Sequence, residues 1–135
     1  MRSPAELSQR LRAEGRKVTP QREAVIRVLS GNEGHPTADA VHAAVVAELP
    51  MVSLRTVYQV LNDLSELGEI QAIDVGTGAA RFDPNVDPHH HLVCTVCGRV
   101  RDVPALPVPA VEVGGFVVER AEIVFRGRCE TCDPD

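Results

Sequence analysis

The chain has 135 residues, which is enough for one ordinary domain or two very small ones. Charged residues or prolines interrupt every apolar stretch before it reaches the roughly 20 residues that a membrane-spanning helix needs, so we expect no transmembrane segment. The first 22 residues have no apolar core of the kind that a signal peptide requires. These features predict a cytoplasmic protein with no membrane partner.

The net charge of −5 hides a segregation of charge along the chain. Residues 1–30 carry seven basic and three acidic side chains, whereas residues 31–74 carry one basic and seven acidic side chains. Because charges more than about 10 Å apart are screened at physiological salt, a basic N-terminal segment can bind phosphate even in an acidic molecule. The overall acidity therefore does not exclude DNA as a partner.

Four short amphipathic helices are predicted in the N-terminal half. Apolar residues recur at helical spacing, and Pro4, Thr19, Thr37 and Ser53 stand where helix starts are expected. Glycines or prolines follow the segments and end them. The predicted helices cover residues 5–14, 20–29, 38–49 and 54–67.

A β-hairpin follows the helices. Segments 69–75 and 79–83 flank Gly76-Thr77-Gly78, a glycine turn that predicts this hairpin. The second, third and fourth helices together with the hairpin are the parts of a winged helix-turn-helix. Prolines bound residues 84–88, and such a segment is typical of a linker between domains.

Strands are predicted beyond the linker, at residues 89–93, 99–103 and 116–126. Three prolines in residues 104–115 leave little room for a helix there. The predicted class is therefore α+β. It comprises a winged helix-turn-helix domain at 1–83, a hinge linker at 84–88 and a small second domain at 89–135.

Two Cys-x-x-Cys pairs lie in the second domain. Cys94 and Cys97 are separated from Cys129 and Cys132 by 31 residues. A reducing compartment disfavours disulfides, and a two-residue gap lets both sulfurs of a pair reach one ion. Four thiolates close a tetrahedral site, so we predict a structural zinc, with a disulfide or a thiol redox pair as the alternatives.

Histidines and carboxylates form a second group of candidate ligands. In a strand, His89 and His91 would lie on one face and His90 on the other. From spacing alone, a solvated polar edge is favoured over a metal site, and the residue types do not choose among iron(II), manganese, zinc and nickel. The other candidate side chains are His35, His42, Asp83 and Asp102.

The order and spacing of five segments resemble the ferric uptake regulator family of metal-dependent bacterial repressors. The segments are HPTADAVHAAV, SLRTVYQVLNDLSELGEI, ARFD, HHHLVCTVCGRVRDV and GRCETC. The likeness extends from about Leu7 to Cys132. It implies a homodimer whose winged helix binds double-stranded DNA at an inverted-repeat operator, and whose C-terminal α/β domain dimerises and carries the structural zinc.

The resemblance also implies a regulatory metal site formed by His35, Asp83, His89, His91 and Asp102. Two of these residues precede the linker and three follow it, so one ion would join the two domains. The ion would then set the angle of each DNA-reading domain. By the same comparison, His90 and His42 are expected at the surface, and the family's further site with a histidine in the last strand is expected to be missing.

Aspartate at position 83 resembles the peroxide-sensing branch of the family, which includes actinobacterial regulators of catalase genes. That likeness implies a regulatory site for iron(II) or manganese(II). With iron(II), hydrogen peroxide would convert a ligand histidine, His35 or His89, to 2-oxo-histidine, and both metal and operator would be released. Manganese(II) would permit DNA binding without this chemistry.

The fourth predicted helix is the candidate recognition helix, because the second helix of this motif enters the major groove. Its polar residues Arg55, Thr56, Tyr58 and Gln59 are the candidates for base or phosphate contacts, although Tyr58 could instead pack within its own domain. Further phosphate contacts are expected from Arg16, Lys17 and Arg22, with a solvated basic face as the alternative.

Two other functions compete with a peroxide-responsive repressor. One is a repressor of metal homeostasis genes that responds to sufficiency of iron, zinc or nickel. The other is a hydrolytic metalloenzyme using His35, His89 and His91, which lacks a convincing base such as that of an HExxH motif. We therefore predict a transcriptional repressor and not an enzyme, with hydrogen peroxide as its small-molecule signal.

Overall fold

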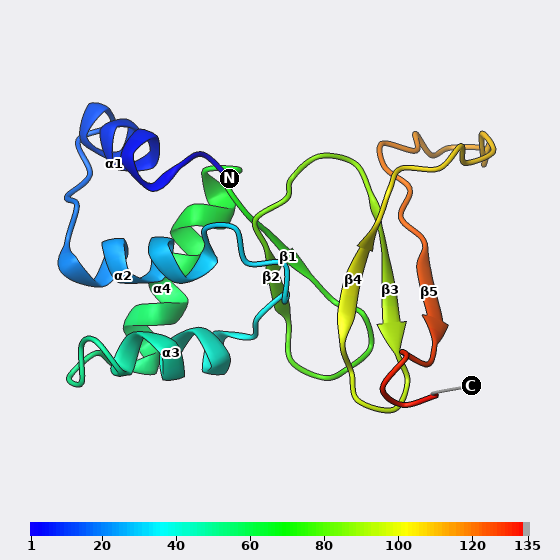
Figure 1. Ribbon diagram of the computed structural model, residues 1–135. Coiled ribbons are helices and arrows are strands. Elements are labelled where there is room, and N and C mark those ends of the chain that lie inside the picture. The colour runs from blue at the N-terminus through cyan, green and yellow to red at the C-terminus, as the bar shows by residue number, and fades with distance from the viewer. Residues whose placement is uncertain (134–135) are drawn as a thin grey trace. The chain divides into compact units, whose positions relative to one another are not determined.

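The structure is a computed structural model that describes residues 1–133, and the chain divides into unit 1, Met1–Val86, and unit 2, Asp87–Asp135. Unit 1 contains the helices and a two-stranded sheet, and unit 2 contains a three-stranded sheet (Figure 1). No helix among the described residues is long and apolar enough to cross a membrane. The architecture is α+β, as predicted.

Unit 1 begins with four helices whose N-caps are serine or threonine. Each cap side chain accepts a hydrogen bond from a backbone N–H in the first turn, which satisfies a donor that the helix itself leaves without a partner. The cap residues are Ser3, Thr19, Thr37 and Ser53. The helices are α1 (Pro4–Ala13), α2 (Pro20–Leu29), α3 (Ala38–Val46) and α4 (Leu54–Glu66).

The core of unit 1 lies between the apolar faces of these helices. Helix α4 presents its buried residues at spacings of three and four, as an amphipathic helix does. They pack in one cluster with buried residues of the other helices and with Phe82 of the sheet. The buried residues of α4 are Val57, Val60, Leu61 and Leu64.

The sheet of unit 1 is a short antiparallel hairpin. Strands β1 (Gln71–Ile73) and β2 (Arg81–Asp83) pair with Ala72 opposite Phe82. Gly76 and Gly78 in the connection have φ of 77° and 102°, a backbone region that glycine reaches without steric cost. The strands are shorter than the predicted segments, because the ladder pairs only residues 71–73 with residues 81–83.

Unit 2 is built on a central strand, β3 (His90–Cys94). It pairs antiparallel with β4 (Val100–Val103) and parallel with β5 (Val124–Gly127), as Figure 1 shows. Among its described residues there are three strands and no helix, in agreement with the three prolines of residues 104–115. The resemblance implied an α/β domain, but the described residues of unit 2 form only a sheet.

Two further predicted boundaries differ from the structure by several residues. The predicted strand at 116–126 is ordered as a strand only from Val124, because residues 116–123 lie outside the ladder with β3 and are mostly exposed. The third helix ends at Val46 and not at Leu49, since Pro50 has no N–H to donate to the carbonyl of Val46 and its ring would clash with that carbonyl in a continued helix.

Candidate metal centres

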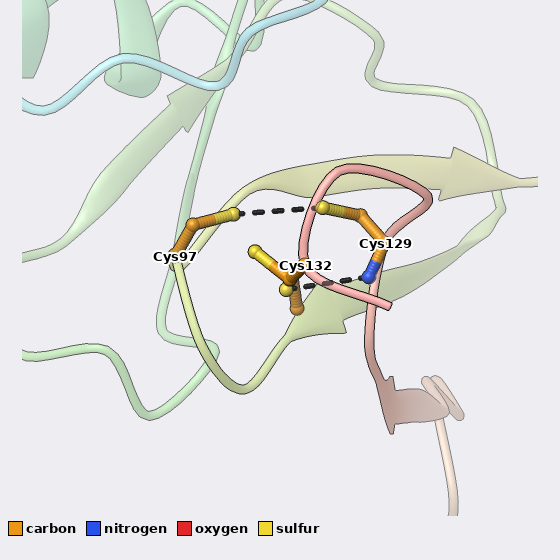
Figure 2. A group of neighbouring side chains, drawn as sticks. Cys97, Cys129 and Cys132 are labelled. Carbon is orange, nitrogen blue, oxygen red and sulfur yellow. Dashed lines mark hydrogen bonds between the residues drawn. The ribbon is translucent and has the colours of Figure 1, made fainter. Parts of the chain in front are cut away.

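Four cysteines of unit 2 converge at one end of its sheet. Cys94 ends β3, Cys97 follows it in a turn, and Cys129 and Cys132 lie just after β5. Their four sulfurs all lie within 4.8 Å of one another, and none is in a disulfide. Figure 2 shows the sulfur of Cys97 facing that of Cys129, at 3.8 Å. This donor set fits a closed tetrahedral zinc site and leaves no position for a substrate.

The backbone around the thiols favours the thiolate of Cys94. Backbone hydrogen bonds from Cys97, Cys129 and Val96 lower the pKa of Cys94 to about 6. Side-chain hydrogen bonding with Cys129, followed by burial, raises the pKa of Cys132 to about 12. Four neighbouring thiols cannot all ionise without a cation to balance their charge, and a divalent ion such as zinc would supply that balance.

A histidine and a carboxylate of unit 1 form one pair of candidate ligands. Nε2 of His35 lies 3.3 Å from Oδ2 of Asp83, and both side chains are buried. Asp83 ends β2, and its Oδ1 accepts a hydrogen bond from the backbone N–H of Asn85.

The backbone of His35 is held in an unusual conformation. Its φ is 49°, which is uncommon for a residue other than glycine. The next residue, Pro36, accepts a hydrogen bond from the backbone N–H of Phe82 at 2.9 Å, and the guanidinium of Arg81 donates to the carbonyl of His35 at 3.2 Å. These contacts tie the loop before α3 to β2 and bring His35 beside Asp83.

Three further candidate ligands converge within unit 2. His91 is paired with Asp102 across β3 and β4, and His89 lies two residues before His91. Nε2 of His89 is 3.0 Å from Nε2 of His91 and 3.1 Å from Oδ1 of Asp102. Nε2 of His91 is 3.5 Å from the same oxygen. Two imidazole nitrogens and a carboxylate oxygen thus meet in one place, a donor set that suits iron(II), manganese(II) or zinc.

The other nitrogen of each ring has its own partner. Nδ1 of His89 is 2.6 Å from the backbone carbonyl of Asp87, and Nδ1 of His91 is 2.7 Å from Oε1 of Glu122. Each Nδ1–H donates to its oxygen, which leaves Nε2 as the available lone pair. No sequence pattern marks Glu122, because parallel pairing between distant strands brings it beside His91.

Two remaining histidines differ from expectation. His90 was expected at the surface, but it is buried, because its Nδ1 accepts a hydrogen bond from the N–H of Ile123 and its ring lies against Phe125. His42 is half-buried on α3, with Nε2 at 3.0 Å from the carbonyl of Val52. The prediction of a surface position was therefore wrong for His90, whereas His42 stays partly exposed.

A polar groove in unit 1 gathers several of the candidate DNA contacts. Its volume is about 460 Å³. Asp63 of α4 lies in it and pairs with Arg22 at 3.0 Å and with Arg16 at 3.8 Å. Arg55 and Tyr58 are exposed on α4 but do not line the groove. The candidate contacts that line it are Arg16, Lys17, Arg22, Thr56 and Gln59.

Comparison with known proteins agrees with this combination of helices, sheets and ligand clusters. A model of the ferric uptake regulator family matches residues 13–112. The chain belongs to this family. One relative is the peroxide-responsive repressor PerR of Staphylococcus epidermidis. The two sequences are 32% identical over 127 residues, which cover 90% of this chain and 85% of the relative.

Solved structures of the family share the fold. The Helicobacter pylori ferric uptake regulator, described as having three functional metal-binding sites, superposes with a TM-score of 0.73 at 18% identity, covering 95% of this chain and 89% of that one. The Campylobacter jejuni peroxide stress regulator gives a TM-score of 0.64 at 25% identity, covering 98% and 100%. The expected family resemblance is thus confirmed.

Proposed function

We propose that this chain is a metal-dependent repressor that binds an inverted-repeat DNA operator as a homodimer and releases it in response to hydrogen peroxide. The convergence of His89 Nε2, His91 Nε2 and Asp102 Oδ1 carries the proposal, because it places a ligand group apart from the cysteines. The likeness to a peroxide-responsive repressor over 90% of the chain supports the nature of the signal.

We further propose that the ligands of the two units share one regulatory ion. His35 and Asp83 alone offer one nitrogen and one carboxylate, and the three ligands of unit 2 leave coordination positions for more. Together the five would hold iron(II) or manganese(II), while the cysteines hold zinc. Residues 84–88 would act as the hinge, and loss of the ion would free each DNA-binding domain to rotate.

His35 and His89 are the side chains that we assign to oxidation. With iron(II) bound, hydrogen peroxide would be the two-electron oxidant of a ligand ring: one peroxide oxygen would be added to a ring carbon and the other would leave as water, whereas manganese(II) would hold the same ligands without this reaction. A histidine that gains an oxygen atom on its ring becomes a poor ligand, so oxidised His35 or His89 would no longer coordinate the ion. The chain's own part is to hold both rings with Nε2 toward the site.

Exposed apolar side chains of unit 2 support the homodimer. Soluble monomers rarely leave so many large apolar residues exposed to water on one small unit. We propose that a second copy of this chain covers them in a homodimer. In the described part of unit 2, those at least half exposed are Val96, Val111, Val113, Phe116, Val117 and Val118.

Helix α4 is the proposed recognition element. Arg55, Thr56, Tyr58 and Gln59 would reach base edges and nearby phosphates from its first two turns. Arg16, Lys17 and Arg22 would contact phosphates around the groove, which positions the domain without reading sequence. Asp63 neutralises part of this charge until a phosphate competes for Arg16 and Arg22.

The test is DNA binding by the zinc-loaded chain at one fixed salt concentration, because salt alone changes such affinities strongly. We expect binding with either manganese(II) or iron(II), and loss of binding after peroxide only with iron(II). Peptide mass mapping should then find one added oxygen atom on His35 or His89. Binding that follows metal concentration but is indifferent to peroxide would instead indicate a repressor that senses metal sufficiency.

A further inference from the structure

The two converging histidines of unit 2 are held by chemically different partners. The acceptor for His89 Nδ1–H is the neutral backbone carbonyl of Asp87, at 2.6 Å. The acceptor for His91 Nδ1–H is the carboxylate of Glu122, at 2.7 Å. A negatively charged acceptor draws the Nδ1 proton more strongly than a carbonyl does, so it leaves more electron density on the ring and makes Nε2 a better donor.

The fold fixes the place of Glu122. In the parallel ladder of β3 and β5, His91 lies opposite Val124, two residues beyond Glu122. The backbone N–H of His91 donates to the carbonyl of Ile123 at 3.1 Å, and the N–H of Ile123 donates to His90 Nδ1 at 3.1 Å. The N–H and the C=O of Ile123 are thus both hydrogen-bonded, and this fixes the backbone next to Glu122.

The surroundings of the pair favour a fixed ring. The His91 side chain is fully buried and that of Glu122 is 30% exposed, so the hydrogen bond is only partly accessible to water. The second carboxylate oxygen lies 3.8 Å from the guanidinium of Arg120, a second contact that holds the Glu122 side chain in place. Oε1 is thus held toward Nδ1 of His91, on the side of the ring away from Nε2.

We propose that Glu122 is a positioning residue that fixes His91 in the Nδ1–H form and makes it the stronger of the two histidine ligands in unit 2. Glu122 is not itself a ligand in this role; it acts through the imidazole. The inference rests on the regulatory metal site proposed above. In this proposal the two histidines bind the ion with unequal strength: His91 binds it more tightly and His89 more weakly.

The first test measures cobalt(II) affinity of the zinc-loaded full-length chain by competition with a chelator. Glu122→Gln keeps the acceptor oxygen and nearly the same shape but removes the charge, so we expect about tenfold weaker binding. Glu122→Ala removes the acceptor as well and should weaken binding by about 10- to 100-fold. Glu119→Gln, an exposed carboxylate on the same segment, is the matched control and should leave the affinity unchanged.

The second readout is the tautomer of His91 in protein without the regulatory metal, measured by nitrogen-15 NMR at mildly alkaline pH. We expect the Nδ1–H form in the parent chain and in Glu122→Gln, and a shift toward the Nε2–H form in Glu122→Ala. A residue that only stabilises the fold would not move this equilibrium. Circular dichroism and the melting temperature check that each variant is folded.

His91→Ala separates the two proposals. If His91→Ala abolishes cobalt(II) binding while both Glu122 variants bind as the parent chain does with an unchanged tautomer, the role of Glu122 is overturned and the metal site stands. If His91→Ala binds cobalt(II) at this site as tightly as the parent chain, the metal site itself is wrong, and the proposal for Glu122 falls with it.

Discussion

Glu69 shows how one buried charge can be stabilised by partners far away in the sequence. Its side chain is 2% exposed and lies between the end of α4 and β1. Burial raises the pKa of Glu69, but hydrogen bonds from the backbone N–H of Arg2 and from the guanidinium groups of Arg10 and Arg2 outweigh it, so the net pKa lies below 4.5. The carboxylate therefore connects the N-terminal segment and α1 to the start of the β1–β2 hairpin.

Replacing this carboxylate should make the free energy of unfolding of unit 1 less dependent on pH in the acid range. A group with a depressed pKa contributes stability that is complete above its unfolded-state pKa and is lost as pH falls through the folded-state value. We expect Glu69→Gln to lower the free energy of unfolding by about 1–3 kcal/mol at neutral pH and by less in acid. Urea unfolding followed by circular dichroism at both pH values measures the difference.

The control for this substitution is Glu66→Gln, which removes an exposed carboxylate from the last turn of α4. It should change the free energy of unfolding little at either pH, since exposed charges contribute little. Equal destabilisation of Glu69→Gln in acid and at neutral pH would show that shape, and not the ionised carboxylate, is what stabilises this region.

At the scale of the element, α4 combines a core-forming face with a polar face that begins at its N-terminus. Ser53 Oγ accepts a hydrogen bond from the backbone N–H of Thr56 at 3.1 Å. Farther along, Ser65 Oγ donates back to the carbonyl of Leu61 at 2.9 Å. The first serine satisfies a donor that the helix end leaves open, whereas the second shares an acceptor that the helix already uses.

The two serines should therefore respond differently to alanine. We expect Ser53→Ala to lower the free energy of unfolding of unit 1 by about 1 kcal/mol, because a cap is lost. Ser65→Ala should change it by less than about 0.5 kcal/mol or raise it, since alanine has the higher helix propensity. Chemical unfolding of both variants checks this, and an equal loss would contradict the assigned capping role.

The sequence predicted elements whose determinants are local and failed where they are not. Caps, helical spacing and glycines placed the starts of α2, α3 and α4 correctly. The last strand was predicted too long because only pairing with β3 determines where β5 begins. The burial of His90 was missed for the same reason, since Ile123 and Phe125 reach it only through that pairing.

The candidate sites show the same division. The cysteine spacing alone predicted a cluster, because each Cys-x-x-Cys pair is a local geometry. His89, His91 and Asp102 were brought together by the family resemblance, and spacing by itself favoured a polar edge. Glu122 could not be predicted from sequence, since nothing local marks a carboxylate 31 residues beyond the histidine that it contacts.

At the scale of the whole molecule, the two units differ in how much apolar core they contain. Unit 1 buries a cluster drawn from its four helices and Phe82. Among the described residues of unit 2, the buried apolar side chains are only Val93, Cys94 and Val100. A core of this size cannot offset the conformational entropy of ordering the chain, so unit 2 requires a further source of stability. Zinc at the four cysteines would provide it.

Unit 2 should therefore unfold when one zinc ligand is lost, while unit 1 stays folded. We expect Cys97→Ser to abolish hydrogen-exchange protection of β3 and to leave the helical circular dichroism of unit 1 nearly unchanged, because the helices carry their own core. Thr131→Ser changes an exposed residue between the second pair of cysteines without removing a thiolate, and it should retain protection. Protection of β3 in Cys97→Ser equal to that of the parent chain, with no zinc bound, would show that the sheet is stable without metal.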